Sequence, residues 1–470
     1  MTLQRMRKPC CSFRDLRRLI LSYLRVKTSR LSGIAAPIQT AEAARCSGGI
    51  ESRRTDRVNT GSTLFFFRRN TTRRLNSGGR VPPRDKRAPG RESRPHDGKK
   101  QGTHPAFFTP APPSENGLIT DIDALPAALV ASAGADERAY IARLAEHGGL
   151  PFAVTPHFAS LARPERSDPI RRQFFPDPRE GAPDLAALAD PLGEALHRAA
   201  PRLVHQYRDR ALLLAGGTCA GFCRHCFRRV WLGTRQPFIG GGELQPALAY
   251  LSAHPEIREI LVSGGDPLTA DDEALSALFA ALRDARPAAL LRLCTRAPVT
   301  DPQRLTEDAI RLLRRYRPLR LVAHINHPRE LCEAAKSRLS ACVEAGIPVH
   351  VQTVLLRGIN DDPAVLAELF RACLDAGLTP YYLFQLDLAP GTRHFRVPLE
   401  TGLALYRELA ALISGLALPA YAVDLPGGGG KIRLRDGVIA GTAETPAGTM
   451  YRLLDANGKA WLYPADRPDP

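Results

Sequence analysis

The sequence predicts an α/β fold, in which a partial (β/α)6 barrel follows a disordered basic N-terminal tail and a mainly helical segment. Two observations predict the barrel: from about residue 210 onward, short apolar runs alternate with amphipathic stretches, and the runs have the length of buried strands. A third is that 44% of the 470 residues are hydrophobic, enough to bury a large core. We therefore divide the chain into four regions, at residues 1–115, 116–209, 210–415 and 416–470.

Residues 1–115 are expected to form a disordered basic extension, because they have no sustained apolar periodicity. The first 100 residues hold 25 Lys and Arg but 7 Asp and Glu, whereas the whole chain has a formal net charge of +17. The rest of the chain is therefore close to neutral. We favour an unselected extension, translated from a start codon placed too early, over an arm for nucleic acid or a transit peptide. Nucleic acid is accordingly not expected as a partner.

Apolar periodicity places the individual elements. The second region is expected to be mainly helical, with helices at 123–133 and 137–146. Barrel strands are expected at 211–214, 259–263, 290–294, 319–324, 348–355 and 379–385. The helices between them are expected at 271–284, 307–315, 328–345, 363–376 and 400–413. Strands linked in this way pair in parallel through right-handed crossovers, and the active site of such barrels lies at their C-terminal ends.

The last region combines a strand at 420–424, a run of four glycines at 427–430 and a hairpin turn at Asn457-Gly458. No stretch approaches the roughly 18 consecutive apolar residues of a membrane helix, so no membrane association is expected. With no recognisable secretory signal, we expect a cytoplasmic protein with reduced thiols.

The strongest chemical signal follows the first barrel strand, where the sequence reads Cys219-Ala-Gly-Phe-Cys223-Arg-His-Cys226. Three thiolates at this spacing can hold one 4Fe-4S cluster and leave its fourth iron open to a ligand. A zinc site usually has a fourth ligand, and a redox pair needs no third cysteine. His225 would be awkwardly placed as a fourth ligand. Four further cysteines lie in apolar runs, which indicates core positions: Cys294, Cys332, Cys342 and Cys373.

The end of the next strand supports a cluster, since it reads Val262-Ser263-Gly264-Gly265-Asp266-Pro267. Together with the cysteine loop, this glycine pair resembles the radical S-adenosylmethionine (SAM) superfamily, whose fold is the partial radical-SAM barrel. In that superfamily the absent Cβ atoms let the backbone approach the methionyl amino group of the cofactor. The resemblance implies that SAM is bound at strand ends by Ser263, Gly264, Gly265, Asp266, His324 and Gln352.

A wider set of motifs narrows the resemblance to the lysine 2,3-aminomutase family, from about residue 151 to about residue 434. The matching stretches lie at 207–210, 226–229, 263–268, 295–299, 324–328, 352–361, 381–382, 387 and 424–431. The implied activity is that of an isomerase, which converts L-lysine to β-lysine by a 1,2-amino migration. The resemblance implies a 4Fe-4S cluster, SAM, pyridoxal 5′-phosphate (PLP) and a one-electron reductant such as ferredoxin or flavodoxin. It also implies a homo-oligomer.

Lys431 directly follows the four glycines, so its amine should be presented by a flexible and sterically open loop. By itself such a lysine is usually a solvated surface residue. The resemblance implies instead that Lys431 is the catalytic lysine that binds PLP covalently, which needs a reachable and readily deprotonated amine. It likewise implies Arg210 as the partner of the cofactor phosphate, where a guanidinium fork fits well.

Three side chains bear on the substrate. The resemblance implies that Arg228 binds the substrate carboxylate and that Asp387 and Asp424 bind the distal ammonium of lysine. Without the resemblance, Asp387 could be a cap, and Arg228 or Asp424 could belong to a salt bridge. Glutamate 2,3-aminomutases replace the two acidic positions with residues suited to a carboxylate. Because both are Asp here, lysine is favoured over glutamate.

Two features depart from the family pattern. Phe384 stands where the best-known members have a tyrosine near PLP, which removes a hydroxyl. No cysteine follows Cys373, so the C-terminal segment that holds structural zinc in those members is missing and no zinc is expected. Shorter relatives that supply β-lysine for the modification of elongation factor P also lack this segment. They stay an alternative, although residues 427–431 match the catabolic or osmolyte type more closely.

Overall fold

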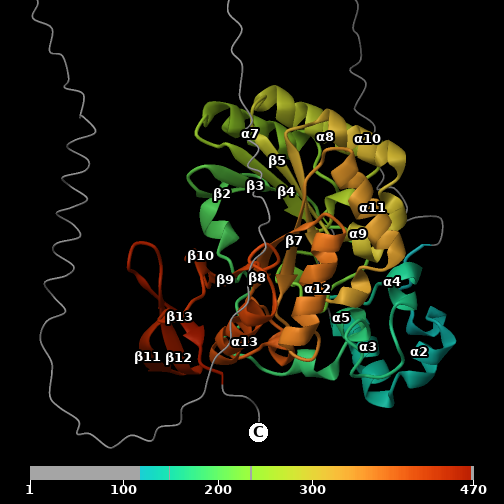
Figure 1. Ribbon diagram of the computed structural model, residues 1–470, viewed down its shortest axis with the longest axis vertical. Coiled ribbons are helices and arrows are strands. Elements are labelled where there is room, and N and C mark those ends of the chain that lie inside the picture. Colours follow the sequence, from blue (N-terminus) through green and yellow to red (C-terminus); the bar gives the residue numbers. More distant parts are fainter. Residues whose placement is uncertain (1–116, 148, 233–235, 467–470) are drawn as a thin grey trace, which may run out of the picture. The chain divides into compact units, whose positions relative to one another are not determined.

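The computed structural model describes residues 117–147, 149–232 and 236–466 (Figure 1). The basic extension predicted at 1–115 lies outside the described residues, so its disorder and its role stay predictions. Within the described part of the chain, no helix is both long and apolar enough to cross a membrane.

The centre of the fold is a ten-stranded sheet whose strands follow one another in chain order. Its middle strands run parallel: β3 (Arg210–Gly216), β4 (Glu259–Gly264), β5 (Leu290–Thr295), β6 (Leu319–His324), β7 (Val349–Val354), β8 (Thr379–Phe384) and β9 (Ala420–Leu425). The six barrel strands and the strand at 420–424 are thereby confirmed. The α/β class with a parallel sheet is correct, while the curvature of a partial barrel stays a prediction.

Antiparallel strands extend both edges of this sheet. At one edge lie β1 (Arg198–Ala200) and β2 (Leu203–Tyr207), with β2 paired to β3. At the other edge, β10 (Gly430–Arg433) pairs with β9. The sequence predicts mainly helices at 116–209, so the two strands at the end of that region are a correction. Leu203 is fully buried against the sheet, and this tertiary pairing decides the local structure.

Helices connect the parallel strands and pack against the sheet (Figure 1). They include α7 (Gly241–Ala253), α8 (Asp272–Ala285), α10 (Glu307–Arg315), α11 (Glu333–Glu344), α12 (Pro363–Asp375) and α13 (Leu399–Leu412). All but α7 are predicted by the sequence; two glycines open α7 and Pro246 lies inside it, which weakens its helical signal. The helix predicted at 328–345 is shorter, because the separate turn η6 (Pro328–Glu330) precedes α11.

The strands alternate between a fully buried and a half-buried face. In β4, Ile260 and Val262 are buried in the core, whereas Leu261 and Ser263 are partly exposed. β5 repeats the pattern, with a half-buried Cys294. Because successive side chains of a strand point to opposite faces, polar residues at the strand ends can collect on the half-buried face. The site described below lies on that face.

A smaller helical unit precedes the sheet in the chain. Its helices are α2 (Ala127–Ser132), α3 (Ala135–His147), α4 (Pro156–Ser160) and α5 (Arg171–Phe174). Its own core contains the aromatic rings of Phe152, Phe158, Phe174 and Phe175. The helix predicted at 137–146 is confirmed, and the one predicted at 123–133 is split into η1 (Ile122–Ala124) and α2. Pro126 lies at the break, where it disfavours helical backbone in the residue before it.

After β10 comes a separate antiparallel sheet of three strands, β11 (Ile439–Thr445), β12 (Gly448–Leu454) and β13 (Ala460–Pro464). The predicted turn at Asn457-Gly458 joins β12 to β13, with Gly458 in the left-handed region at φ 80°. The Tyr463 hydroxyl donates a hydrogen bond to the Leu386 carbonyl at 3.0 Å. This sheet therefore packs beside the segment that follows β8.

Candidate active site

The cysteine loop directly follows β3, as the sequence predicts. Burial, followed by the charges of Asp266, Cys226 and Cys223, raises the pKa of the Cys219 thiol well above its usual value. Burial, followed by the charge of Cys223, raises the pKa of Cys226 to about 12. The structure thus brings the three thiols close enough to act on one another, and each of them is half-buried. None of them is in a disulfide.

Guanidinium groups surround these thiols. Nη1 of Arg296 lies 2.6 Å from Sγ of Cys223. While burial raises the pKa of Cys226, the charges of Arg228 and Arg229 lower it. Positive charge beside sulfur favours the thiolate, which is the form that binds iron. The donor set and its cations therefore fit an anionic 4Fe-4S cluster.

The cysteine loop does not form a site for a single metal ion. Among the described residues, no three His, Cys, Asp or Glu side chains are arranged around one ion. A 4Fe-4S cube does not need that arrangement, because each thiolate binds a different iron. His225 is not favoured as a fourth ligand, since its Nε2 faces the amide nitrogen of Asn326 at 3.2 Å. Its Nδ1 is buried without a hydrogen-bond partner in the described part of the chain.

Backbone hydrogen bonds and a buried ion pair hold the cysteine loop in place. The Phe222 N–H donates to the Ala153 carbonyl at 2.9 Å, and the Arg224 N–H donates to the Gln173 carbonyl at 2.8 Å. The Arg224 guanidinium is fully buried and forms a two-pronged pair with Glu180, at 2.8 and 2.6 Å. Because a buried charge is tolerated only when it is paired, Glu180 fixes the loop to the segment before the sheet.

A second buried polar network lies beside the loop. Nη2 of Arg296 donates to Oε1 of Gln173 at 2.5 Å and to Oε2 of Glu330 at 3.1 Å. The Asn326 amide also donates to Oε1 of Gln173, at 3.0 Å. Burial lowers the pKa of Arg296, but the charges of Cys223 and Glu330 outweigh it and the net shift is upward. Arg296 is therefore a permanent cation at the sulfur.

The glycine pair at the end of β4 is required by the neighbouring backbone. A Cβ on Gly264 would lie 2.5 Å from the Gly216 carbonyl oxygen, and one on Gly265 would lie 2.2 Å from that of Thr218. Gly264 also has a φ of 120°, which side chains other than glycine rarely adopt. The missing Cβ atoms thus let β4 approach the start of the cysteine loop. The predicted contact of these glycines with SAM stays a prediction.

Protein donors saturate the Asp266 carboxylate. It accepts hydrogen bonds from the Thr295 hydroxyl at 2.6 Å and from the N–H groups of Arg296 at 2.7 Å, Ala297 at 2.9 Å and Leu268 at 3.0 Å. Burial raises the pKa of Asp266, although these hydrogen bonds oppose the shift. Asp266 therefore joins the end of β4 to the end of β5, a role that its motif does not reveal.

His324 and Gln352 are register partners at the ends of β6 and β7. Nε2 of His324 lies 3.0 Å from Oδ1 of Asn326, and its ring meets the His225 ring edge-on at 5.4 Å. Burial lowers the pKa of His324 to about 3, so its ring is neutral at pH 7. The predicted SAM residues thus lie towards the C-terminal ends of β4, β6 and β7, and His324 contacts His225 of the cysteine loop.

Lys431 lies on a strand, not on an open loop as the sequence predicts. It is the second residue of β10 and pairs in register with Asp424 of β9. Its Nζ is 2.5 Å from Oδ2 of Asp424, and it lies over the Phe384 ring at 3.9 Å and the Tyr382 ring at 5.3 Å. Glycines within 427–430 adopt positive φ and turn the chain back along β9. The turn therefore fixes the lysine instead of freeing it.

Tyr207 links Lys431 to the predicted phosphate partner. Its hydroxyl accepts a hydrogen bond from the Lys431 backbone N–H at 2.9 Å, and the Arg210 guanidinium lies 3.8 Å from its ring centre. Arg210 uses Nη1 in an ion pair with Asp209 at 3.0 Å, which leaves several of its five N–H donors for another acceptor. A lysine amine beside aromatic rings, with such an arginine close by, fits PLP.

Asp387 follows the end of β8 and belongs to the same charged group as Lys431. Burial, followed by the charge of Asp424, raises the pKa of Asp387 to about 8; Lys431 and Arg228 act against this shift, and Glu194 adds to it. These five side chains therefore share one site. Carboxylates this close favour a bound cation, which would let all of them ionise.

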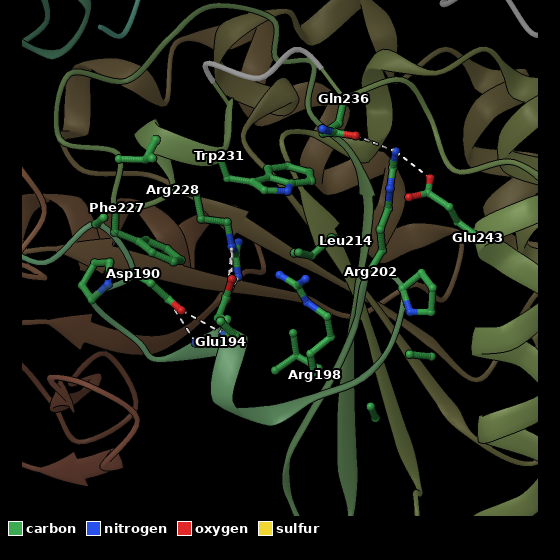
Figure 2. A pocket seen from close by; sticks show the side chains of 18 residues that line it. Asp190, Glu194, Arg198, Arg202, Leu214, Phe227, Arg228, Trp231, Gln236 and Glu243 are labelled. Atoms are coloured by element: carbon green, nitrogen blue, oxygen red, sulfur yellow. Dashed lines mark hydrogen bonds and ion pairs between the residues drawn. The ribbon is translucent and has the colours of Figure 1, made fainter.

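Arg228, the predicted partner of the substrate carboxylate, is paired with Glu194 in this structure (Figure 2). Its Nη2 lies 2.5 Å from Oε1 of Glu194. The pair forms part of the wall of a cavity of about 850 Å³, whose other lining residues include Arg198, Arg202 and Trp231. This volume is typical of a site for a small molecule. The lining of this cavity does not include Lys431, Asp387 or Asp424, so the role of Arg228 at the substrate carboxylate stays a prediction. The structure adds Glu194, an acid that the motifs do not reveal.

Known proteins resemble this chain over more than half of its length. A protein of Treponema pallidum (strain Nichols), provisionally named an L-lysine 2,3-aminomutase, is 47% identical over 291 residues, which are 62% of this chain and 81% of that protein. The L-lysine 2,3-aminomutase of Clostridium subterminale is 38% identical over 60% of this chain and 68% of its own. The chain belongs to the lysine 2,3-aminomutase family. Members of this family are isomerases that move an amino group, and this chain is an enzyme of that class.

Similarity extends to an aminomutase with another substrate. The glutamate 2,3-aminomutase of Clostridioides difficile is 34% identical over 67% of this chain and 74% of its own, so relatedness alone does not decide the substrate. No family model matches the chain. Among solved structures, a radical SAM methyltransferase from Sphaerobacter thermophilus has 20% identity and a TM-score of 0.38, over 47% of this chain and 68% of that one. A similarity this slight supports no argument about fold or chemistry.

The aminomutase site includes residues for which the sequence carries little signal. Gln173 is 123 residues from its partner Arg296, and Glu194 is 34 residues from Arg228. Pairs so distant along the chain are visible only in the folded protein. Tyr207 is different, because it lies within the matching stretch 207–210 and could have been proposed as a site residue.

Proposed function

We propose that the enzyme is a radical-SAM, PLP-dependent L-lysine 2,3-aminomutase, which moves the α-amino group of L-lysine to C3 and forms β-lysine. One observation carries the proposal: Arg228, two residues after Cys226, has Nη1 3.4 Å from the Ser263 hydroxyl and Nη2 2.5 Å from Glu194. The residue before Glu194, Gly193, approaches Gly428 in the glycine run before Lys431. These contacts support a single site for the proposed cluster, cofactor and substrate residues. This juxtaposition is what a radical transfer to a PLP-bound substrate requires.

In this proposal Cys219, Cys223 and Cys226 hold the 4Fe-4S cluster, and Arg296 balances the charge of its thiolates. A one-electron reductant such as ferredoxin or flavodoxin serves the cluster, whose chemistry is the reductive cleavage of SAM to a hydrogen-abstracting radical. The proposed SAM partners are Ser263, Gly264, Gly265, Asp266, His324 and Gln352. Asp266 would act by fixing two strand ends, because its carboxylate is already saturated.

Lys431 binds PLP covalently in this proposal, with Arg210 at the cofactor phosphate. PLP supplies the π-system on which the amino group passes between neighbouring carbons. Asp424 lies 2.5 Å from the Lys431 amine and holds it in position on β10. Phe384 provides an apolar wall 3.9 Å from this amine, where the best-known members of the family have a tyrosine.

The two aspartates favour lysine over glutamate as substrate. The distal ammonium of lysine would neutralise the excess negative charge that contributes to the raised pKa of Asp387, whereas a second substrate carboxylate would add to it. Arg228 would bind the substrate carboxylate through a guanidinium fork. Because Lys431 already contacts Asp424, its ammonium and that of the substrate compete for this carboxylate.

The reaction can be tested with anaerobically reconstituted enzyme, supplied with PLP, SAM, a reductant and carbon-13 lysine or glutamate, with the products followed by NMR. We expect β-lysine from lysine and no product from glutamate. Cys223→Ala and Lys431→Ala should each lower the rate at least 1,000-fold. The matched controls are Cys342→Ala, at a buried core cysteine, and Lys459→Ala, at a lysine that lies over Trp461.

Conversion of glutamate in place of lysine would overturn the assignment of the two aspartates. Cleavage of SAM without any rearranged amino acid would support the radical chemistry but would exclude both lysine and glutamate as substrates. Full activity in Lys431→Ala would overturn the role of this lysine. If both control variants retain activity, losses in the test variants can be assigned to the replaced groups.

A further inference from the structure

We infer that Glu194 is a positioning residue for the substrate: it holds one edge of the Arg228 guanidinium and thereby directs the other edge at the substrate carboxylate. The inference rests on the proposed function and deepens it, because it names a residue that sets the affinity for an α-carboxylate. No motif contains Glu194 and no cofactor role accounts for it.

The geometry of the pair leaves one edge of Arg228 open. Both carboxylate oxygens of Glu194 lie 3.2 Å from Nε, and Oε1 lies 2.5 Å from Nη2. A guanidinium has five N–H donors, so this contact occupies the Nε side and leaves Nη1 for another acceptor. The hydrogen bond of Nη1 goes to the Ser263 hydroxyl, at a long 3.4 Å. A substrate carboxylate could therefore bind at Nη1 without displacing Glu194.

Glu194 is itself held firmly. The Asp190 carboxylate accepts hydrogen bonds from the Glu194 N–H at 3.0 Å and the Ala195 N–H at 2.9 Å, which orients the short helix η3 (Glu194–His197). Gly193 has a φ of 64°, and a Cβ there would lie 2.6 Å from the Gly428 nitrogen. The segment that carries Glu194 thus packs on the glycine run before Lys431, and this contact sets its position relative to the lysine.

The alternative is that the pair merely stabilises the fold. Arg228 and Glu194 are 13% and 18% exposed, and ion pairs removed from water to this extent add little net stability. They lie on the cavity wall, where a ligand can reach them (Figure 2). The Phe227 ring packs on the guanidinium at 4.5 Å and further restricts its rotation. A wall residue held from two sides is suited to orient a ligand.

The test compares lysine with 1,5-diaminopentane, which has both amines of lysine but no carboxylate. In Glu194→Ala, the KM for lysine should rise about tenfold or more while kcat changes less than threefold. The inhibition constant of the diamine should stay within twofold of its wild-type value, because this ligand makes no use of Arg228. Glu194→Gln keeps an acceptor for Nη2 and should raise the KM by a smaller factor.

Glu259→Gln is the matched control, since Glu259 pairs with Arg292 at 2.5 Å at the start of β4, outside this cavity. It should leave the KM for lysine unchanged. An unchanged KM in Glu194→Ala, or equal weakening of lysine and diamine, would overturn the inference while leaving the proposed function in place. A wild-type enzyme that does not convert lysine would overturn the proposed function, and the inference with it.

Discussion

The cysteine loop and the surroundings of Lys431 balance their charges in different ways. Beside the loop, three buried arginines share two acids: Glu180 lies 2.6 Å from both Arg224 and Arg229, and Glu330 lies 3.1 Å from Arg296. Every one of these acids is fully buried. This framework is complete before any ligand binds, and it can hold a rigid inorganic cluster without rearrangement.

Around Lys431 the charges are not balanced. Lys431 pairs with Asp424, and Arg228 pairs with Glu194, but Asp387 is left as a further acid whose pKa is raised to about 8 by burial and by Asp424. The group lacks one positive charge. Under the proposed function, the comparison separates a framework that would hold a permanent cofactor from a pocket whose last charge a substrate would supply.

The largest effect on stability is expected from Glu180→Gln in the framework of the cysteine loop. A neutral amide cannot balance the two buried arginines, so the free energy of unfolding should fall by about 3–5 kcal/mol. Urea denaturation followed by circular dichroism measures this loss. Asp308→Asn is the control, because it breaks an exposed pair with Arg311 and should change stability by less than about 0.5 kcal/mol. Similar losses of stability in both variants would contradict the claim that Glu180 balances the two buried arginines.

A smaller effect is expected from Gly265→Ala. The new Cβ would lie 2.2 Å from the Thr218 carbonyl oxygen, so the backbone next to Cys219 must shift at a cost of about 1–3 kcal/mol. Reconstituted enzyme should also bind less iron, which elemental analysis measures. The control is Gly242→Ala in α7, where no atom lies within 4 Å of the added Cβ. Full iron content in Gly265→Ala would show that this close approach does not position the thiols.

On the other side of the comparison, Asp387→Asn should stabilise the ligand-free enzyme at alkaline pH. The pKa of Asp387 is about 8 in the folded protein against a usual 3.8, so the folded state binds more protons between these values. Wild-type stability is therefore lost as pH rises from about 4 to about 8, and the asparagine removes this loss. Because one pH unit in this range corresponds to about 1.4 kcal/mol, the gain should be about 3 kcal/mol larger at pH 8.5 than at pH 5.5. Equal gains at both pH values would contradict the raised pKa.

The smallest effect is expected from Tyr463→Phe, which tests how the C-terminal sheet supports the substrate pocket. It removes the hydrogen bond to the Leu386 carbonyl, next to Asp387, and should cost about 1 kcal/mol. Thermal unfolding measures the loss, and Thr449→Val in β12 provides a control in the same sheet, because it removes an exposed hydrogen bond to Glu444. A larger loss in the control would mean that the hydrogen bond to Leu386 contributes less to stability than the hydrogen bond removed in the control.

Local patterns predicted most of the fold. The six barrel strands and most of their helices could be placed because apolar periodicity is a property of neighbouring residues, and β4 to β8 follow it closely. The strands β1 and β2 could not, since they exist through pairing with β3. The candidate residues of the site were likewise available from motifs, but their partners Glu180, Glu194 and Glu330 were not.

The sequence by itself determined which groups are candidates for the chemistry. They are three cysteines with the spacing of a cluster site, a lysine that follows a glycine run, and an arginine and two aspartates proposed for the substrate. Only the tertiary structure decided how these groups are held. It places Lys431 on β10 against Asp424, and it pairs Arg228 with Glu194. The physical reason is that motif spacing is local along the chain, whereas the balance of buried charges depends on side chains that meet only after the sheet has formed.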